Sequence, residues 1–364
     1  MKISLLKRIL TSYKILGTTF GKWIIPIFAA IYLVSVRSIS SLFSMLDYIF
    51  IPSIWTKKIE KPIIIVGNPR SGTTFLHRFL VNNGFGTGTQ LWQMIYPSVI
   101  LQKIIRPILP ILEYLSPAKY HSTDAHKTSL GSVETDDASM LFRFFDGFFL
   151  YGFILSWSKN NLFDWVDPNK RDNSKRDFKW FESMWKIVLI SSGGKRIVAK
   201  LFSLSSNLPA FTQKFPDSKI LYMVRDPLSV IPSGLSLVTG VLDKMFGFWS
   251  MPEKDRQRFI SRLYIALVEL MLRFHKDWTN GSIDKSKVMI VHFDQMMNEF
   301  DVLMENIIKF VGHDSSEKLL NDIKVTAENQ KQFKSKHKYN LDKFGLTEEQ
   351  IKKDCNVIYE TFIN

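Results

Sequence analysis

The stretch IIIVGNPRSGTTFLHRFL, residues 63–80, constrains the fold more than any other part of the chain. Its first four residues are β-branched and lie between Pro62 and Gly67, which predicts a short strand buried on both faces. A glycine-bounded loop follows, and a helical pattern begins near Thr73 or Thr74. A strand, a loop and a helix in this order form the βα unit in which backbone amides and a helix N-terminus bind phosphate.

Three further segments have the composition of strands, and helical patterns alternate with them. The strand candidates are residues 195–202, 218–227 and 287–294, and the helical pattern after the last one closes at Gly312. Alternation of this kind predicts an α/β fold of three layers, in which helices flank a mostly parallel central sheet.

The loop from Gly67 to Thr74 keeps the glycine spacing of the nucleotide-binding pattern G-x-x-x-x-G-K-[ST], but Thr73 stands in the lysine position. In ATP and GTP hydrolases that lysine reaches the β and γ phosphates, and the hydroxyl after it helps to hold magnesium. Its loss argues against a nucleoside-triphosphate enzyme. The loop still has several hydroxyls and a cation, Arg70, so it can hold a phosphate.

The charge balance favours an anionic partner. Lys and Arg number 48 and Asp and Glu 34, a net charge of +14, which suits a phosphate-bearing cofactor, an acidic substrate or an anionic membrane. The basic residues are scattered, so we expect no nucleic-acid partner. The single cysteine, Cys355, excludes an intramolecular disulfide framework and a cysteine-based zinc site, and it fits a reducing compartment.

The amino-terminal segment is the apolar outlier of the chain. Its uncharged core between Lys22 and Arg37 is shorter than the ~20 residues of a spanning helix, and Pro26 is expected to interrupt it. We therefore expect a monotopic, interfacial segment rather than a transmembrane span, with a buried helical pair as the alternative. On this basis residues 1–58 form a membrane-associating segment with a linker, and residues 59–364 form the catalytic domain.

Basic residues flank the apolar segment on both sides, so the positive-inside rule gives no clear orientation. We expect a membrane-associated protein whose catalytic domain is cytoplasmic.

Two motifs carry a family resemblance. VGNPRSGTTFLHRFL resembles the 5′-phosphosulfate loop of sulfotransferases, and FPDSKILYMVRDPLSVIPSGLSLV resembles their 3′-phosphate motif. Other segments, such as HKTSLGSVETDDASMLF and SKHKYNLDKFGLTEEQI, are similar to a bacterial and protist-type branch with a hydrophobic N-terminal region. The resemblance covers most of the chain from about Leu46 on. It implies a P-loop-like fold and the donor 3′-phosphoadenosine 5′-phosphosulfate, with no metal required.

The resemblance also implies roles for the loop residues. Ser71, Gly72, Thr73 and Thr74 would hold the 5′-phosphate at the helix start. Arg70 would stabilise the charge that develops on the leaving phosphate, and since arginine does not readily give up a proton, this role is electrostatic.

The second motif implies a 3′-phosphate site made by Arg225 and Ser233. A fork-shaped guanidinium beside a hydroxyl suits a dianionic phosphate, while a surface ion pair of Arg225 with Asp226 is the alternative. Lys200, at the end of an edge strand, and Lys338, in a short basic run, are implied as further donor contacts. For both, a solvated lysine is the alternative.

Transfer to a hydroxyl also needs a general base. His126 titrates near neutrality, and Glu134 could orient it or act as the base itself, while His121 is a weaker candidate. The alternative for Glu134 and the aspartates after it is the acidic N-terminal turn of a helix. In some sulfotransferases the base is a glutamate closer behind the phosphate loop, but the corresponding segment here has Gln93, which cannot take a proton.

The leading hypothesis is a sulfotransferase at a membrane face, acting on a hydroxyl or amine of a small-molecule, lipid or glycan acceptor. Two other classes stay open. A P-loop phosphotransferase is disfavoured by Thr73, and a non-catalytic protein would bind anionic lipid through its basic surface and aromatic amino-terminal segment.

Overall fold

The computed structural model describes residues 2–116, 129–332 and 340–364. The chain forms two compact units. The first comprises Met1–Ile59, Thr87–Ile197 and Ser236–Leu263, and the second comprises Glu60–Gly86, Val198–Leu235 and Tyr264–Asn364.

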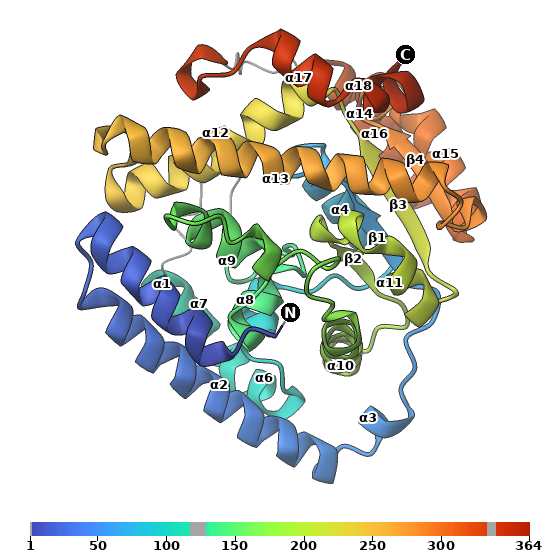
Figure 1. The fold of residues 1–364 in the computed structure, drawn as a ribbon. Coiled ribbons are helices and arrows are strands. Elements are labelled where there is room, and N and C mark those ends of the chain that lie inside the picture. The colour runs from blue at the N-terminus through green and yellow to red at the C-terminus, as the bar shows by residue number, and fades with distance from the viewer. Residues whose placement is uncertain (1, 117–128, 333–339) are drawn as a thin grey trace. The chain divides into compact units, whose positions relative to one another are not determined.

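The second unit is built on a four-stranded parallel sheet with the strand order β2-β1-β3-β4 (Figure 1). The strands are β1 Ile63–Val66, β2 Val198–Lys200, β3 Lys219–Val224 and β4 Val288–His292. Ile63 pairs with Val198 on one side and with Lys219 on the other, so β1 is a central strand. Each of the four predicted strand segments contains one of these strands, and the prediction of an α/β fold with a parallel sheet is confirmed.

Helices follow the strands as predicted. Those that lie wholly within the second unit are α4 Thr73–Asn82, α11 Leu208–Lys214, α14 Phe293–Asn298, α15 Phe300–Val311, α16 Glu317–Gln332, α17 Glu348–Asp354 and α18 Asn356–Ile358. Two long helices, α12 Pro227–Phe246 and α13 Glu253–Thr279, contain unit boundaries. The helical pattern after β4 ends at Gly312 in the left-handed conformation as expected, but it is divided at Glu299 into α14 and α15.

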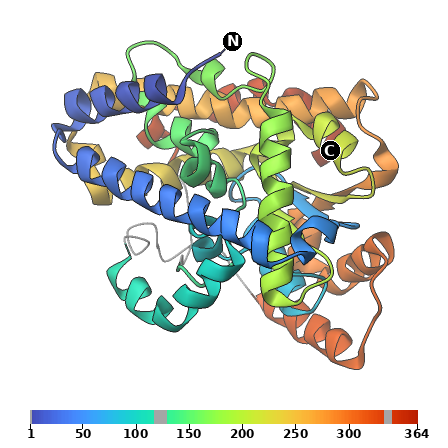
Figure 2. The ribbon, with the colours of Figure 1, turned by 90° about the horizontal axis from the view of Figure 1, so that it is seen from below.

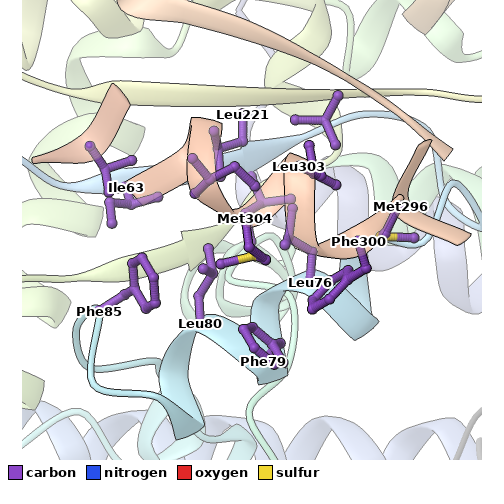
Figure 3. Close-up of a cluster of buried hydrophobic side chains, with 14 of the residues drawn as sticks. Ile63, Leu76, Phe79, Leu80, Phe85, Leu221, Met296, Phe300, Leu303 and Met304 are labelled. Atoms are coloured by element: carbon purple, nitrogen blue, oxygen red, sulfur yellow. The ribbon is translucent and has the colours of Figure 1, made fainter. Parts of the chain in front are cut away.

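Both faces of the sheet are covered. On one face Ile63 and Leu221 pack into an apolar cluster with residues of α4, α14 and α15, among them Phe79, Phe300 and Met304 (Figure 3). On the other face Tyr222 of β3 stacks on Phe274 of α13, with 3.3 Å between ring centroids. Because neighbouring residues of a strand point to opposite faces, these contacts make three layers with the sheet in the middle.

The first unit is helical. Its helices are α1 Leu5–Phe20, α2 Ile25–Phe50, α3 Ser53–Thr56, α5 Leu91–Ile95, α6 Val99–Ile105, α7 Leu109–Leu115, α8 Ala138–Phe144, α9 Phe148–Phe153 and α10 Ser174–Ser192. The short 3₁₀ helices among the described residues are η1 Arg106–Ile108, η3 Leu155–Trp157, η4 Phe163–Trp165, η5 Ser203–Ser206, η6 Phe248–Ser250, η7 Lys285–Lys287 and η8 Asp342–Phe344, and η9 Tyr359–Ile363 is a short π-helix.

The amino-terminal segment is a pair of antiparallel helices, α1 and α2 (Figure 2). The expectation that Pro26 interrupts the apolar stretch is wrong, because Pro26 lies in the first turn of α2. The proline nitrogen needs no hydrogen-bond partner at that position, and its fixed φ suits the helix. The helix therefore continues past Arg37 to Phe50. Among the described residues it is the one helix long and apolar enough to cross a bilayer.

A buried ion cluster joins α1 to the rest of the first unit. The Asp146 carboxylate accepts two hydrogen bonds of 2.9 Å from the Arg171 guanidinium and one of 3.0 Å from Arg176. Arg8 of α1 lies 3.7 Å from the same carboxylate and donates to the carbonyl of Phe145. Burial opposes ionisation of Asp146, but the three guanidinium groups outweigh it and hold the pKa of Asp146 below its ordinary value.

Candidate active site

Residues from four parts of the sequence, most of them polar or charged, meet at the carboxyl ends of the strands in the second unit. The predicted phosphate loop follows β1, Lys200 ends β2, Arg225 follows β3, and Phe293 follows β4. In an open parallel sheet this edge is where ligands bind, because loops and helix N-termini converge there.

Two glycines shape the loop between β1 and α4. Gly67 has a φ of 139°, and a Cβ atom there would lie 2.7 Å from the carbonyl oxygen of Met223 in β3. Gly72 has a φ of 86°, and its Cβ would lie 2.4 Å from the Met296 side chain. A larger residue at Gly67 would push the loop away from β3, so this glycine is required by space as well as by conformation. At Gly72 the close atom is the flexible end of Met296, and the positive φ is what favours glycine. The Asn68 amide donates to the carbonyl of Leu267 at 2.8 Å and fixes the loop to α13.

The loop leads directly into the N-terminus of α4. Gly72 is the N-cap, and it has no side chain that could accept from the N–H groups of the first turn. Ser71 and Thr73 are buried beside it, and Thr74 is half-buried. The positive end of the helix dipole and these N–H groups make a site suited to an anion.

Arg70 connects the two predicted phosphate-binding motifs. Its φ of 78° is in the left-handed region, which is uncommon for a residue with a side chain. The carbonyl of Arg70 accepts a hydrogen bond of 2.7 Å from the Arg225 guanidinium, and its own Nε donates to the Ser233 hydroxyl at 2.9 Å. The structure thus brings Arg70 together with Arg225 and Ser233. These two partners lie 155 and 163 residues after Arg70 in the sequence.

Lys200 adds a third cation to this cluster, and Phe293 supports Arg225. The Arg225 guanidinium lies 3.8 Å from the centre of the Phe293 ring, a cation–π contact that fixes its plane. Lys200 is only 5% exposed and donates to the Thr74 hydroxyl at 2.9 Å. Lys200 is therefore a buried lysine at the loop, and the solvated alternative for it is wrong.

The residue after Arg225 anchors this turn. Asp226 accepts from the backbone N–H of Leu228 at 2.9 Å, at the start of α12, and from the Tyr359 hydroxyl at 2.6 Å. Burial raises the pKa of Tyr359, and the Asp226 carboxylate raises it further, so this hydroxyl keeps its proton and remains a donor. The carboxyl-terminal turn η9 therefore supports the segment that presents Arg225.

Of the base candidates, the structure describes Glu134. Glu134 belongs to the first unit, where it is 5% exposed and accepts a hydrogen bond of 2.8 Å from the Ser132 hydroxyl. Asp137 is the N-cap residue of α8, so the predicted acidic turn does precede a helix. Gln93 caps α5, because its side-chain oxygen accepts from the backbone N–H of Gln90. His121, His126 and Lys338 lie outside the described residues.

Three residues of the site were not predicted from the sequence: Asn68, Phe293 and Tyr359. A signal was present for Phe293, since it directly follows the fourth predicted strand and the ends of parallel strands share one edge. No local pattern marks Asn68 or Tyr359, whose partners are about 200 and 133 residues away.

A parallel sheet with a phosphate-type loop and several cations at its carboxyl edge defines an α/β protein with a site suited to an anionic ligand. A family model described as the sulfotransferase family matches residues 62–317, which is most of the chain and includes both motifs. The chain belongs to the sulfotransferase family. It is therefore an enzyme, a transferase of sulfuryl groups.

Solved structures show the same fold. A sulfotransferase from Mycobacterium tuberculosis is similar with a TM-score of 0.72 at 16% identity, over 96% of this chain and 90% of that chain. A sulfotransferase from Mycobacterium avium is similar with a TM-score of 0.70 at 15% identity, over 88% of this chain and 81% of that chain. No curated protein matches the sequence.

Throughout residues 2–116, 129–332 and 340–364, no three His, Cys, Asp or Glu residues are grouped so that they could hold a metal ion. The absence of a metal requirement for sulfuryl transfer stays a prediction.

Proposed function

We propose that the protein transfers a sulfuryl group from 3′-phosphoadenosine 5′-phosphosulfate to a hydroxyl or amine of an acceptor. The observation that carries this proposal is the contact of Arg70 with both Arg225 and Ser233. A donor with phosphates at both its 3′ and 5′ positions needs two anion sites at a fixed separation, and here the loop and the second motif are directly linked. Lys200 and the N-terminus of α4 add to the positive field.

In the proposed reaction the acceptor oxygen or nitrogen attacks sulfur, and the bond between sulfur and the 5′-phosphate oxygen breaks. The electron pair of that bond stays on the phosphate, and the proton of the acceptor passes to a base. Arg70 and the amides of the loop would stabilise the negative charge on the leaving phosphate. Arg225 and Ser233 would hold the 3′-phosphate, because the Ser233 hydroxyl that accepts from Arg70 can still donate its own proton to a phosphate oxygen.

We propose His126 and Glu134 as candidates for the base. Glu134 already accepts from Ser132, and this contact fixes its carboxylate. His126→Gln and Glu134→Gln separate the candidates, because loss of the base lowers kcat and removes the matching limb of the pH–rate profile.

The proposed acceptor is a lipid or glycan that is presented at a membrane. Support comes from the exposed apolar helix α2 in the amino-terminal segment. In this proposal residues 1–58 provide membrane association and residues 59–364 provide catalysis, with the catalytic part in the cytoplasm.

Calorimetry with adenosine 3′,5′-bisphosphate, ADP and ATP tests the donor. Since a hydrogen bond to a charged group is worth about 1.5–3 kcal/mol, ligands without the 3′-phosphate should bind roughly tenfold to a hundredfold more weakly. Arg225→Ala should abolish this preference, while Lys309→Ala, which changes an exposed lysine of α15, should not. Equal binding of ATP and the bisphosphate by the native protein contradicts the proposal.

A further inference from the structure

Helix α2 has the reverse of the usual amphipathic arrangement. The residues that it buries are polar, Ser40 and Asp47, the latter only 1% exposed. Large apolar side chains lie outside, among them Phe28 at 67% and Phe50 at 69% exposed. A surface helix in water normally turns its apolar side toward the core. In α2 the apolar face is instead left for another partner.

The inner face of α2 is fixed by specific hydrogen bonds within the first unit. The Asp47 carboxylate accepts from the backbone N–H groups of Val99 and Ile100, at 2.7 and 2.9 Å, at the start of α6. The Ser44 hydroxyl donates to the carbonyl of Pro97 at 2.9 Å. A helix that left the protein to cross a bilayer would lose these bonds and carry Asp47 without them into hydrocarbon, which is costly.

The apolar surface continues beyond α2. Phe43 of α2 packs against a buried cluster that includes Leu101 and Ile105 of α6, and the two helices are neighbours (Figure 2). On the outside, Ile104 and Ile108 are exposed as well. Aromatic residues mark the two ends of α2, with Trp23 before it and Tyr48 and Trp55 at its end, all exposed. Aromatic side chains at such positions are typical of the membrane–water interface.

Two arginines line a small pocket beside this surface. Arg37 of α2 and Arg143 of α8 share it with the apolar and aromatic side chains of Val36, Phe142 and Trp180. Arg143 donates to the Ser41 hydroxyl at 3.0 Å and lies over the Trp180 ring, 5.1 Å from its centre. Burial lowers the pKa of Arg143, and the charge of Arg37 lowers it further. In the described part of the chain neither arginine forms a salt bridge with a carboxylate.

We propose that the first unit binds an anionic phospholipid surface, with α2 lying in the plane of the membrane and a lipid phosphate contacting Arg37 and Arg143. In this arrangement the pocket, which is lined by both arginines and by apolar side chains of α2, would take the lipid phosphate. The two guanidinium groups repel each other, so a phosphate bound by both lowers their electrostatic energy. The exposed apolar side chains of α2 are stabilised by burial in lipid. A helix α2 that lies in the plane of the membrane keeps its hydrogen bonds to the rest of the first unit. This inference does not depend on the identity of the sulfuryl donor.

Vesicle flotation of the full chain tests the lipid chemistry. Phosphatidylcholine vesicles with phosphatidylglycerol should bind the protein more tightly than vesicles without it. Because a basic residue near an anionic surface is worth about 1 kcal/mol, Arg37→Gln should weaken binding to the anionic vesicles about fivefold. Lys318→Gln, at an exposed lysine of α16, is the matched control. Equal binding of native protein to both vesicle types, or equal effects of the two variants, overturns the phosphate contact.

The apolar contact has its own variants. Phe28→Ser combined with Ile31→Ser should reduce binding to both vesicle types about a hundredfold or more, since burial of each apolar side chain is worth about 1.5–3 kcal/mol. Val325→Ser, at a half-exposed valine of α16, should have no effect. Thermal unfolding without lipid should be the same for all, because these side chains are exposed. If light scattering shows a dimer that the double variant converts to monomers, and vesicles do not bind, a second copy covers this face and the proposal is wrong.

Sidedness distinguishes a lying helix from a spanning one. Thr18→Cys and Thr56→Cys place a thiol at an exposed position before and after α2, and the native Cys355 is fully buried. With protein added to sealed vesicles, a membrane-impermeant maleimide should label both positions. Labelling of one position only, with the other labelled after detergent is added, would show a span and overturn the proposal.

Discussion

The two units of this protein use buried polar groups for different purposes. In the second unit the interior is apolar, and Arg70, Arg225 and Lys200 are gathered at the carboxyl edge of the sheet. In the first unit charged groups lie inside: Asp146 with its arginines, and Asp47 beneath an exposed apolar helix. In the second unit, the polar groups suited to a ligand lie at the ends of the strands. In the first unit, the polar groups that hold helices together have their hydrogen-bond partners inside the protein, and apolar side chains of α2 are left at the surface.

The largest expected effect is on the stability of the first unit. Asp146→Asn would leave Arg8 and Arg171 buried without their counter-charge, which typically costs about 3–5 kcal/mol. Urea unfolding should show this loss, with an exposed control, Asp164→Asn, within about 0.5 kcal/mol of the native protein. A loss below about 1 kcal/mol would show that the cluster contributes little net stability.

The contribution of Asp146 to the free energy of unfolding should depend on pH, and the same variant tests this. The folded-state pKa of Asp146 is depressed, so its stabilisation is present above the unfolded-state pKa, roughly 4, and is lost as the pH falls through the folded-state value. Unfolding free energy measured from neutral pH downward should therefore fall more steeply for the native protein than for Asp146→Asn. Parallel curves would contradict the proposed linkage.

In the second unit the largest effect should be on chemistry rather than stability. Arg70→Ala should lower kcat about a hundredfold to a thousandfold, as removal of a charge-stabilising group does at other active sites. Arg70→Lys keeps the charge and should recover part of the rate. Sulfate transfer from labelled donor measures both, and near-native activity of Arg70→Ala would remove Arg70 from the mechanism.

The smallest effect concerns the aromatic support of Arg225. Phe293→Leu removes a cation–π contact worth about 0.5–1 kcal/mol, so binding of adenosine 3′,5′-bisphosphate should weaken about twofold to fivefold. Phe310→Leu is a matched control, since Phe310 makes the same kind of contact with Lys219 at the amino end of β3, opposite to the carboxyl edge. Equal losses in both variants would mean that the change acts through general packing.

Local sequence was sufficient for much of the second unit. Four β-branched residues between Pro62 and Gly67 became β1, and the helix begins at Thr73 as predicted, because strand propensity, glycine conformations and helix starts depend on neighbours in the chain. Arg225 and Ser233 were expected to act together from their motif. That Arg70 contacts both of them depends on the parallel order of β1 and β3, which spacing alone did not give.

The structure of the first unit was harder to predict from the sequence, for a physical reason. An apolar, proline-containing segment has the same composition whether it spans a membrane, lies on it or is buried, and only the fold shows which side faces the protein. The sequence by itself determined the α/β class, the phosphate loop and the family, because these rest on short-range patterns. Tertiary structure decided that Asp47 faces inward to meet the N–H groups of α6, since a buried carboxylate must find partners that no sequence window contains.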